Sequence, residues 1–302
     1  MCIVFLYIPR DSSESFMLAF NRDESFLRPT SSLHIWENDP NIIGGQDLTF
    51  NGTWLGINKQ TGNLACLTNL VDEVYINKPF QLGKLSRGEV INKFLHSDFA
   101  EKHSFEEIFE DLIKLKDEYN PFNLLVGNLK QMDFFYLNLI HGEWSALPKG
   151  EITGFSNNLM VKGNDWKKVI HGKKLFRELL SKVNFDFSNQ EHEILNIMSD
   201  KEDFGEHIAE ESSIFIPTMF NEIRLIFGTV STSIITVRDG QGVFSEFRNK
   251  TEFDKVKNLL KNRKWKYKLI PYVKMMMLLK RLKTFNFARE LHQVSFGLNE
   301  ST

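Results

Sequence analysis

The sequence predicts an α+β fold with two antiparallel sheets and helices on their outer sides. Three observations lead to this class. Apolar patterns follow the order strands, helices, strands, helices, strands, which is neither a strict β-α alternation nor an all-β series. The composition is that of a globular protein, with 42% hydrophobic and 25% charged residues. No linker rich in Pro, Gly or Ser interrupts the 302 residues, so we expect one large domain followed by a C-terminal extension.

The first part of the chain predicts strands and then helices. Apolar runs at 2–8 and 16–21 predict two buried strands joined by a polar turn, and 42–70 predicts a meander of further strands. Helical spacing of apolar residues predicts a helix over 86–96. The segment Ser104-Phe105-Glu106-Glu107 has the pattern of a capping box and predicts the start of a second helix.

The rest of the chain repeats this order. Turn residues at 238–242 separate two runs of high β-propensity and predict a hairpin. The expected elements are strands at 123–128, 133–139, 150–156, 214–216, 228–237 and 243–248, and helices at 165–182 and 192–198.

Cysteine usage and the absence of several motifs argue against several classes of protein. Two cysteines, Cys2 and Cys66, do not make a disulfide framework and favour a reducing compartment. No zinc site of familiar spacing and no phosphate-binding glycine motif is present, so we expect no resident metal and no nucleotide. The apolar N-terminal run is too short for a membrane span and lacks the features of a signal peptide. We therefore expect a cytoplasmic protein that is not secreted, and a mitochondrial location stays open.

Cys2 is the first candidate for chemistry. Removal of Met1 would give a chain that starts with a thiol and a free α-amine on one residue. Their unperturbed pKa values are about 8.5 and about 8, so the amine can act as local base for the thiol nucleophile. From position alone, a small apolar filler at a strand start is the commoner role.

Four polar residues are the other catalytic candidates. Arg22 and Asp23 follow the second predicted strand, where Arg22 could lower the thiol pKa and hold a carboxylate, and Asp23 could orient the amine. Asn69 and Asn157 each end a predicted strand, and their amides could stabilise an oxyanion. A structural Arg–Asp pair and turn-forming asparagines are the competing interpretations.

A second set of residues is expected to bind ligand. Asn21 opens the polar block after the second strand, and Trp54 lies between glycines where it could form a ligand wall. Thr229 and Ser231 belong to a hydroxyl-rich run that could contact a phosphate or carboxylate. Core packing of Trp54 and simple β-propensity of the Thr/Ser run are the alternatives.

Several segments in fixed order resemble one known family. They are Met-Cys-Ile at the start, Asn21-Arg22-Asp23-Glu24 before Arg28-Pro29, Gly52-Thr53-Trp54-Leu55-Gly56-Ile57, Leu67-Thr68-Asn69, Gly154-Phe155-Ser156-Asn157 and Gly228-Thr229. Together they resemble the transport-and-Golgi-organisation protein 2 family, also called the NRDE family, over roughly 1–250. The chain departs from the family at Val230, where relatives commonly carry Arg.

The resemblance implies both a fold and a function. It implies an N-terminal-nucleophile (Ntn) hydrolase-like αββα four-layer sandwich at 1–250, with 251–302 as a basic C-terminal extension. It also implies roles in mobilising haem and in lipid or acyl-CoA handling, in the cytoplasm, mitochondria and Golgi region. No settled catalytic activity comes with the family. Cysteine Ntn enzymes begin with Cys and surround it with Arg, Asp and Asn groups, to which the five catalytic candidates are similar.

The extension has its own charge pattern. Between 255 and 289 lie twelve of the 37 Lys and Arg residues and none of the 39 Asp and Glu residues. A basic amphipathic helix centred on 272–283 could bind an anionic membrane surface through four cations, or it could pack on the body. Those four are Lys274, Lys280, Arg281 and Lys283. The acidic body argues against a nucleic-acid partner.

Three functional hypotheses follow. The first is a haem-handling protein, with haem as cargo and with an axial ligand that the sequence does not single out. The second is a cysteine Ntn-type amide or thioester hydrolase that uses Cys2 on an acyl lipid or related small molecule. The third is a non-catalytic adaptor that binds membranes through its tail. The sequence leaves the oligomeric state open.

Overall fold

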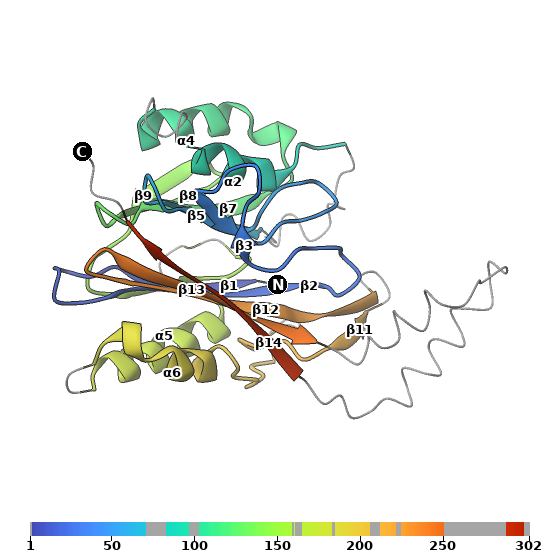
Figure 1. The fold of residues 1–302 in the computed structure, drawn as a ribbon. Helices are drawn as coiled ribbons and strands as arrows, with labels where there is room; N and C mark the ends of the chain where they lie inside the picture. The colour runs from blue at the N-terminus through green and yellow to red at the C-terminus, as the bar shows by residue number, and fades with distance from the viewer. Residues whose placement is uncertain are drawn as a thin grey trace.

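The structure, a computed structural model, describes residues 2–70, 83–96, 103–158, 160, 165–182, 185–205, 212–221, 225–250 and 288–298. Within these ranges the chain forms two antiparallel sheets that pack face to face, with helices on both outer sides (Figure 1). This is the αββα layer order that the sequence predicts, so the predicted fold class is confirmed.

The first sheet holds the beginning and the end of the described chain. Its strands run in the order β10-β1-β2-β12-β13-β14, with β11 paired to β12, and all of these pairs are antiparallel. The strands are β1 (Ile3–Tyr7), β2 (Phe16–Ser25), β10 (Ile152–Phe155), β11 (Met219–Asn221), β12 (Leu225–Arg238), β13 (Gln241–Lys250) and β14 (Ala288–Gly297).

The second sheet is a meander in which each strand pairs with the next one along the chain. Its strands are β3 (His34–Ile35), β4 (Ile42–Gly44), β5 (Leu55–Asn58), β6 (Asn63–Asn69), β7 (Phe122–Asn128), β8 (Asp133–Asn138) and β9 (Glu143–Ala146).

Helices cover the outer face of each sheet. The second sheet carries α2 (Arg87–Leu95) and α4 (Phe105–Lys114), and the first carries α5 (Lys167–Leu180) and α6 (Glu191–Ile197) (Figure 1). Short 3-10 turns lie at Lys116–Glu118 and Phe187–Asn189. None of the helices in the described ranges combines the length and the apolar character that crossing a bilayer requires.

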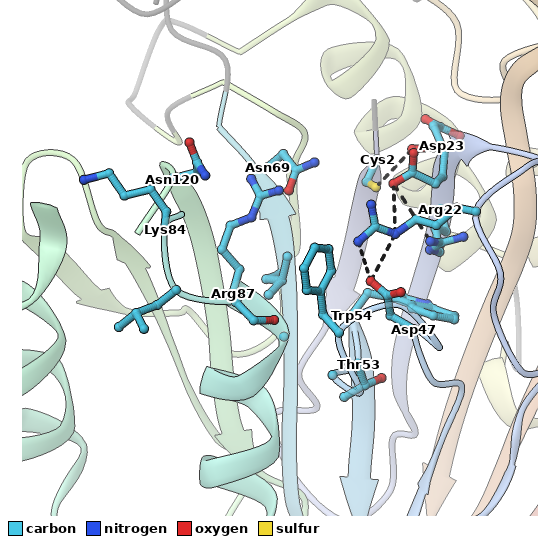
Figure 2. Close-up of a pocket in the computed structure, with 18 residues that line it drawn as sticks. Cys2, Arg22, Asp23, Asp47, Thr53, Trp54, Asn69, Lys84, Arg87 and Asn120 are labelled. Atoms are coloured by element: carbon cyan, nitrogen blue, oxygen red, sulfur yellow. Dashed lines mark hydrogen bonds and ion pairs between the residues drawn. The ribbon is translucent and has the colours of Figure 1, made fainter. Parts of the chain in front are cut away.

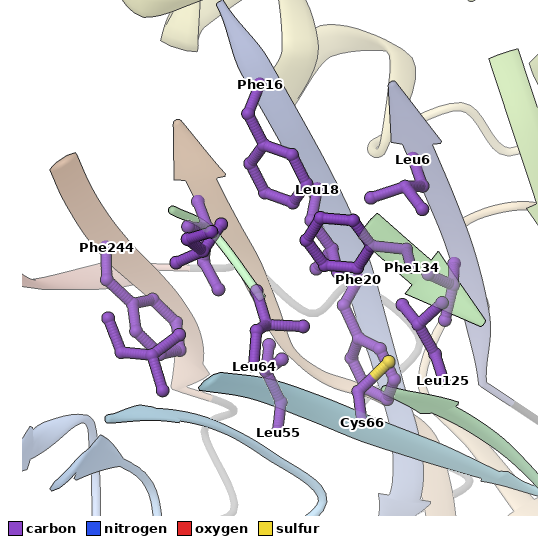
Figure 3. Close-up of a cluster of buried hydrophobic side chains, with 14 of the residues drawn as sticks. Leu6, Phe16, Leu18, Phe20, Leu55, Leu64, Cys66, Leu125, Phe134 and Phe244 are labelled. Carbon is purple, nitrogen blue, oxygen red and sulfur yellow. The ribbon is translucent and has the colours of Figure 1, made fainter. Parts of the chain in front are cut away.

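Alternation along the strands produces three apolar layers. In β2, Phe16, Leu18 and Phe20 point between the sheets, whereas Met17 and Ala19 point toward α5 and α6. Figure 3 shows the layer between the sheets, where the rings of Phe16 and Phe134 stack with centroids 5.0 Å apart. Burial on both faces explains why β1 and β2 begin as nearly continuous apolar runs rather than alternating ones.

Local signals in the sequence are confirmed at two ends of elements. Ser104 and Glu107 form the predicted capping box, in which each side chain accepts the other residue's backbone N–H. The predicted hairpin turns at Asp239 and Gly240, with φ of 50° and 72°. These left-handed angles are what a two-residue turn between twisted strands needs.

Two of the predicted elements are not found among the described residues. Residues 214–216 are buried but lie in irregular backbone, so the predicted strand there is wrong; the neighbouring strand is β11. The helix expected around 272–283 and its four cations lie outside the described residues. The strand β14, which pairs with β13, was not among the predicted elements.

Candidate functional site

A pocket of about 140 Å³ lies at one end of the sandwich, beside the start of β1. In Figure 2, Cys2, which directly precedes β1, lies with Arg22 and Asp23 of β2 on one side of the pocket. Asn69 of β6 and Lys84 and Arg87 near the start of α2 lie across from them. We call this the Cys2 pocket. Its lining residues are Cys2, Arg22, Asp23, Glu24, Arg28, Asp47, Phe50, Gly52, Thr53, Trp54, Leu67, Asn69, Lys84, Leu85, Ser86, Arg87, Gly88 and Asn120.

A hydrogen bond to its backbone carbonyl holds Cys2 at the edge of the pocket. The Ser156 hydroxyl donates a 2.7 Å hydrogen bond to the Cys2 carbonyl oxygen, just beyond the pairing of β1 with β10. The half-buried Cys2 sulfur lies 3.9 Å from the backbone carbonyl oxygen of Asp23, as a weak donor. Burial, together with the nearby Asp23 carboxylate, raises the pKa of the Cys2 thiol. The thiol therefore needs a local base before it can act as a nucleophile.

Arg22 and Asp23 lie inside β2 rather than after it, because the strand continues to Ser25. Arg22 follows the inward-facing series of Phe16, Leu18 and Phe20, so its guanidinium reaches the pocket. Its Cζ atom lies 4.2 Å from the centroid of the Trp54 ring. A guanidinium over an indole face is a favourable cation–π arrangement that also fixes the cation in place.

Asp23 is buried and hydrogen-bonded. The Thr229 hydroxyl donates to the Asp23 Oδ1 atom at 2.6 Å. Burial raises the pKa of Asp23, while the charge of Lys168, a fully buried residue of α5, acts in the opposite direction. The carboxyl is thus placed beside Cys2, in a low-dielectric region that faces α5.

The register of β2 against β12 shifts between Thr229 and Ser231. Thr229 pairs with Asp23 and Ser231 with Arg22, so Val230 is the extra residue of a β-bulge, and its side chain is buried. Neither Thr229 nor Ser231 lines the Cys2 pocket, although Thr229 reaches it indirectly through Asp23. A buried apolar side chain thus occupies the position at which the family resemblance leads us to expect Arg.

The three asparagine candidates differ in where they lie. Asn69 lines the pocket. The side-chain amide of Asn157 donates to the backbone carbonyl of Asn69, so it supports the pocket wall from behind. Asn21 points toward the helices, where it donates to the carbonyls of Met198 and Ile214 at 2.8 and 2.9 Å and accepts from Thr232. The structure does not bring Asn21 to the pocket.

Several charged lining residues were not among the sequence candidates. Arg28 donates from Nε to the Asp47 carboxylate at 3.0 Å. Burial and the nearby Arg28 charge lower the pKa of Arg87 to about 10, so Arg87 is still a cation at neutral pH. Arg28 could have been noticed from the Arg28-Pro29 motif, but the sequence around Arg87 carries no comparable signal.

A glycine contact brings Arg87 to the pocket. A Cβ atom on Gly52 would lie 2.7 Å from the Cα atom of Gly88, so only glycine permits the loop before β5 to touch the first turn of α2. This close approach places the adjacent Arg87 opposite Arg22.

The pocket combines positive charge with an apolar rim. Its described lining contains four cationic side chains, from Arg22, Arg28, Lys84 and Arg87, against three carboxylates. At the rim, Phe50 is 53% exposed and Leu85 is 45% exposed. Such a site can hold the carboxylate or phosphate end of an amphipathic molecule by guanidinium hydrogen bonds and leave the apolar part against the rim.

Comparison with known protein families identifies a family to which most of the chain is similar. The model of a family described as "Transport and Golgi organisation 2" matches residues 1–250. A Mus musculus protein named "Transport and Golgi organization 2 homolog" is 33% identical over 192 residues, which cover 59% of this chain and 64% of the relative. The Homo sapiens homolog is 31% identical over 193 residues, 60% of this chain and 65% of the relative. The matched segments thus span slightly less than two thirds of each relative's length.

Solved structures with a similar arrangement are distant. A C2A mutant of a conjugated bile acid hydrolase from Clostridium perfringens has a TM-score of 0.48 at 12% identity, covering 81% of this chain and 88% of its own. A Caenorhabditis elegans N-acylethanolamine-hydrolyzing acid amidase ortholog has a TM-score of 0.37 at 11% identity, covering 78% and 92%.

Proposed function

The chain belongs to the Transport and Golgi organisation 2 family, and from this membership and the Cys2 pocket we propose that it binds haem and hands it on. One observation carries the proposal: a cationic pocket, an exposed apolar rim and a cysteine thiol lie together. Haem is a flat apolar ring with an iron ion at its centre and two propionates at one edge, so it has a partner for each of these features.

The proposed seat is shallow. A cavity of about 140 Å³ is too small to enclose a porphyrin, so the propionate edge would enter toward Arg22 and Arg87 while the ring lies over Phe50 and Leu85. Fork-shaped guanidinium groups are well suited to carboxylates. A cysteine thiolate is an established haem ligand, and Cys2 is the candidate ligand here, since coordination to the iron would displace the thiol proton that its raised pKa otherwise retains. A shallow seat suits a carrier because the cargo can leave without unfolding of the pocket.

Haem titration of the purified protein tests this proposal. We expect a shifted Soret band with saturation near one haem per chain, and a different band position in Cys2→Ala. Arg22→Met should weaken binding about 10- to 100-fold, the range expected for lost charge-assisted hydrogen bonds. Arg177→Met is the matched control, because Arg177 is exposed on α5. A titration indistinguishable from free haem, or equal binding by Arg22→Met and the control, would refute the proposal.

A second function is favoured by the neighbours of Cys2. The Cys2 sulfur, Arg22, Asp23 and Asn69 line one pocket, which is the set expected for a cysteine Ntn-type amide or thioester hydrolase. In this proposal Met1 is removed, and the new α-amine, positioned by Asp23, takes the thiol proton. The thiolate then attacks the acyl carbonyl carbon, and the Asn69 amide is the candidate oxyanion donor.

The remaining steps regenerate the enzyme. The ammonium returns its proton to the leaving amine or thiol as the tetrahedral intermediate collapses to a Cys2 thioester. Water, activated by the same amine, hydrolyses this thioester and releases the carboxylic acid. The apolar rim at Phe50 and Leu85 would accept the acyl chain, which agrees with the proposed link to lipid and acyl-CoA metabolism.

Intact mass and covalent labelling separate the two proposals. Hydrolysis predicts loss of Met1 in protein from its native cell and stoichiometric labelling of Cys2 by an acyl electrophile. Cys66→Ser is the control, because Cys66 is fully buried in the core. A chain that retains Met1 would rule out the hydrolase mechanism and would not affect the haem-binding proposal.

We also propose a cytoplasmic site of action with contact to the Golgi. Imaging of a tagged chain tests this location.

A further inference from the structure

A second cluster of ligating side chains lies on the outer helical layer, on the α5–α6 side of the first sheet. His171 belongs to α5, and Asp200 and Glu202 follow α6. The His171 Nε2 atom lies 3.1 Å from Asp200 Oδ2 and 3.4 Å from Glu202 Oε2. One ligand atom from each residue lies within 4.8 Å of the other two.

These separations match the edges of a zinc coordination sphere. Zinc binds imidazole nitrogen and carboxylate oxygen at about 2.0–2.2 Å, so two ligand atoms of a tetrahedral site are about 3.4 Å apart. Both carboxylates approach the same ring nitrogen, whereas separate ion pairs could use both Nδ1 and Nε2. A chelating set with one nitrogen and two oxygens is also the chemistry that Zn²⁺ accepts.

The ligand atoms are held by contacts outside the set. Asp200 Oδ1 accepts the backbone N–H of Glu202 at 2.7 Å, which leaves Oδ2 directed to His171. The Asp200 carbonyl accepts the N–H of Phe215 at 2.7 Å. The His171 ring packs against Phe204 with centroids 5.0 Å apart. In metal sites, contacts of this kind to the coordinating side chains fix the orientation of those side chains.

Exposure gives the site a route to solvent. The side chains of His171 and Asp200 are 18% and 26% exposed, whereas that of Glu202 is 58% exposed. The two inner ligands are therefore largely fixed, and the outer carboxylate can close over an incoming ion. A water molecule is the natural fourth ligand on the open side.

We propose that His171, Asp200 and Glu202 bind a zinc ion. The bound ion would contact the imidazole nitrogen and both carboxylates at once. It also clips α5 to the segment after α6, whose Met198 carbonyl accepts a hydrogen bond from Asn21 of β2. The site is independent of the proposed haem and acyl chemistry, because none of its residues lines the Cys2 pocket.

Zinc titration of chelator-treated full-length protein tests the assignment. Calorimetry with ZnCl₂ should show one ion per chain, and a melting temperature that rises with zinc. His171→Ala and Glu202→Gln should each weaken binding at least 10-fold, whereas His192→Ala, on the exposed face of α6, should not. Glu202 is largely exposed, so Glu202→Gln is the variant most certain to fold.

Two results would overturn the proposal. One is wild-type protein that binds no zinc and shows no zinc-dependent melting shift. The other is unchanged zinc affinity in both His171→Ala and Glu202→Gln, which would place any bound zinc elsewhere.

Discussion

The two halves of β2 are one continuous strand with opposite chemistry. Residues 16–20 are apolar and buried on both faces, whereas 21–23 are Asn, Arg and Asp, also buried. The apolar half stabilises the sandwich by removing surface from water. The polar half is satisfied mainly through hydrogen bonds and ring contacts, which offset the cost of its burial. A strand that only had to fold would not need that second half, so its chemistry indicates a function.

The largest expected effect comes from removing an aromatic ring between the two sheets, where the apolar half of β2 is packed. Phe134→Ala deletes the ring that stacks on Phe16, and Phe134 is 1% exposed. We expect the free energy of unfolding to fall by about 3–5 kcal/mol, because a buried cavity replaces the ring. Urea unfolding measures this loss. A loss below about 1 kcal/mol would mean that the layer between the sheets is not the main source of stability.

Substitution in the polar half should have little effect on the free energy of unfolding. Arg22→Met keeps much of the side-chain volume and removes a buried cation whose ion pair with Glu24 is long, at 3.9 Å. Because burial of that cation is itself costly, the free energy of unfolding should change by less than about 1 kcal/mol or increase. Haem affinity should still fall, as proposed above. If urea unfolding shows Arg22→Met to be as destabilised as Phe134→Ala, Arg22 is a structural residue and the contrast between the two halves is lost.

The sequence predicts the apolar half of β2 well and the polar half less well. Strand 16–21 and the hairpin at Asp239-Gly240 follow from local patterns that act within a few residues. The extension of β2 through Arg22 and Asp23 depends instead on pairing with β12, about two hundred residues later. A local sequence pattern predicts a loop wherever polar residues follow one another. It cannot show that these residues are buried in a strand, because their hydrogen-bond partners lie far away in the sequence.

The site shows the same limit. Cys2, Arg22, Asp23, Trp54 and Asn69 were predicted and line one pocket. Arg87 was missed, because the contact that brings α2 to the pocket joins two glycines with no distinguishing local pattern. Asn21 was predicted as a ligand-binding residue from its neighbours. The alternation of the strand instead turns it toward α6, where the carbonyl of Met198 accepts its amide hydrogen.

A smaller effect is expected from the titration of Asp23. Burial raises the native pKa of Asp23 above the unfolded value of about 3.9. The native state therefore binds this proton more tightly than the unfolded state does. This contribution to the free energy of unfolding is complete below about pH 4 and is lost as pH rises through the native pKa. Asp23→Asn should flatten the wild-type curve of stability against pH over that interval.

Urea unfolding at a series of pH values measures this slope. Asp239→Asn is the matched control, because Asp239 is exposed in the β12–β13 turn and Asn also tolerates its φ of 50°. If the curve of Asp23→Asn runs parallel to that of wild type, titration of the Asp23 carboxyl does not contribute to the pH dependence of stability.

The smallest change in stability should come from the rim of the pocket. Phe50 is 53% exposed, so Phe50→Ser should alter the free energy of unfolding by no more than about 0.5 kcal/mol. If the rim supports the porphyrin ring, the same substitution should weaken haem binding measurably in the Soret titration. Phe134→Ala and Phe50→Ser then form a matched pair in which loss of an aromatic ring costs stability at one position and binding at the other. Equal haem affinity in wild type and Phe50→Ser would remove the rim from the proposed seat and leave only the cationic interior.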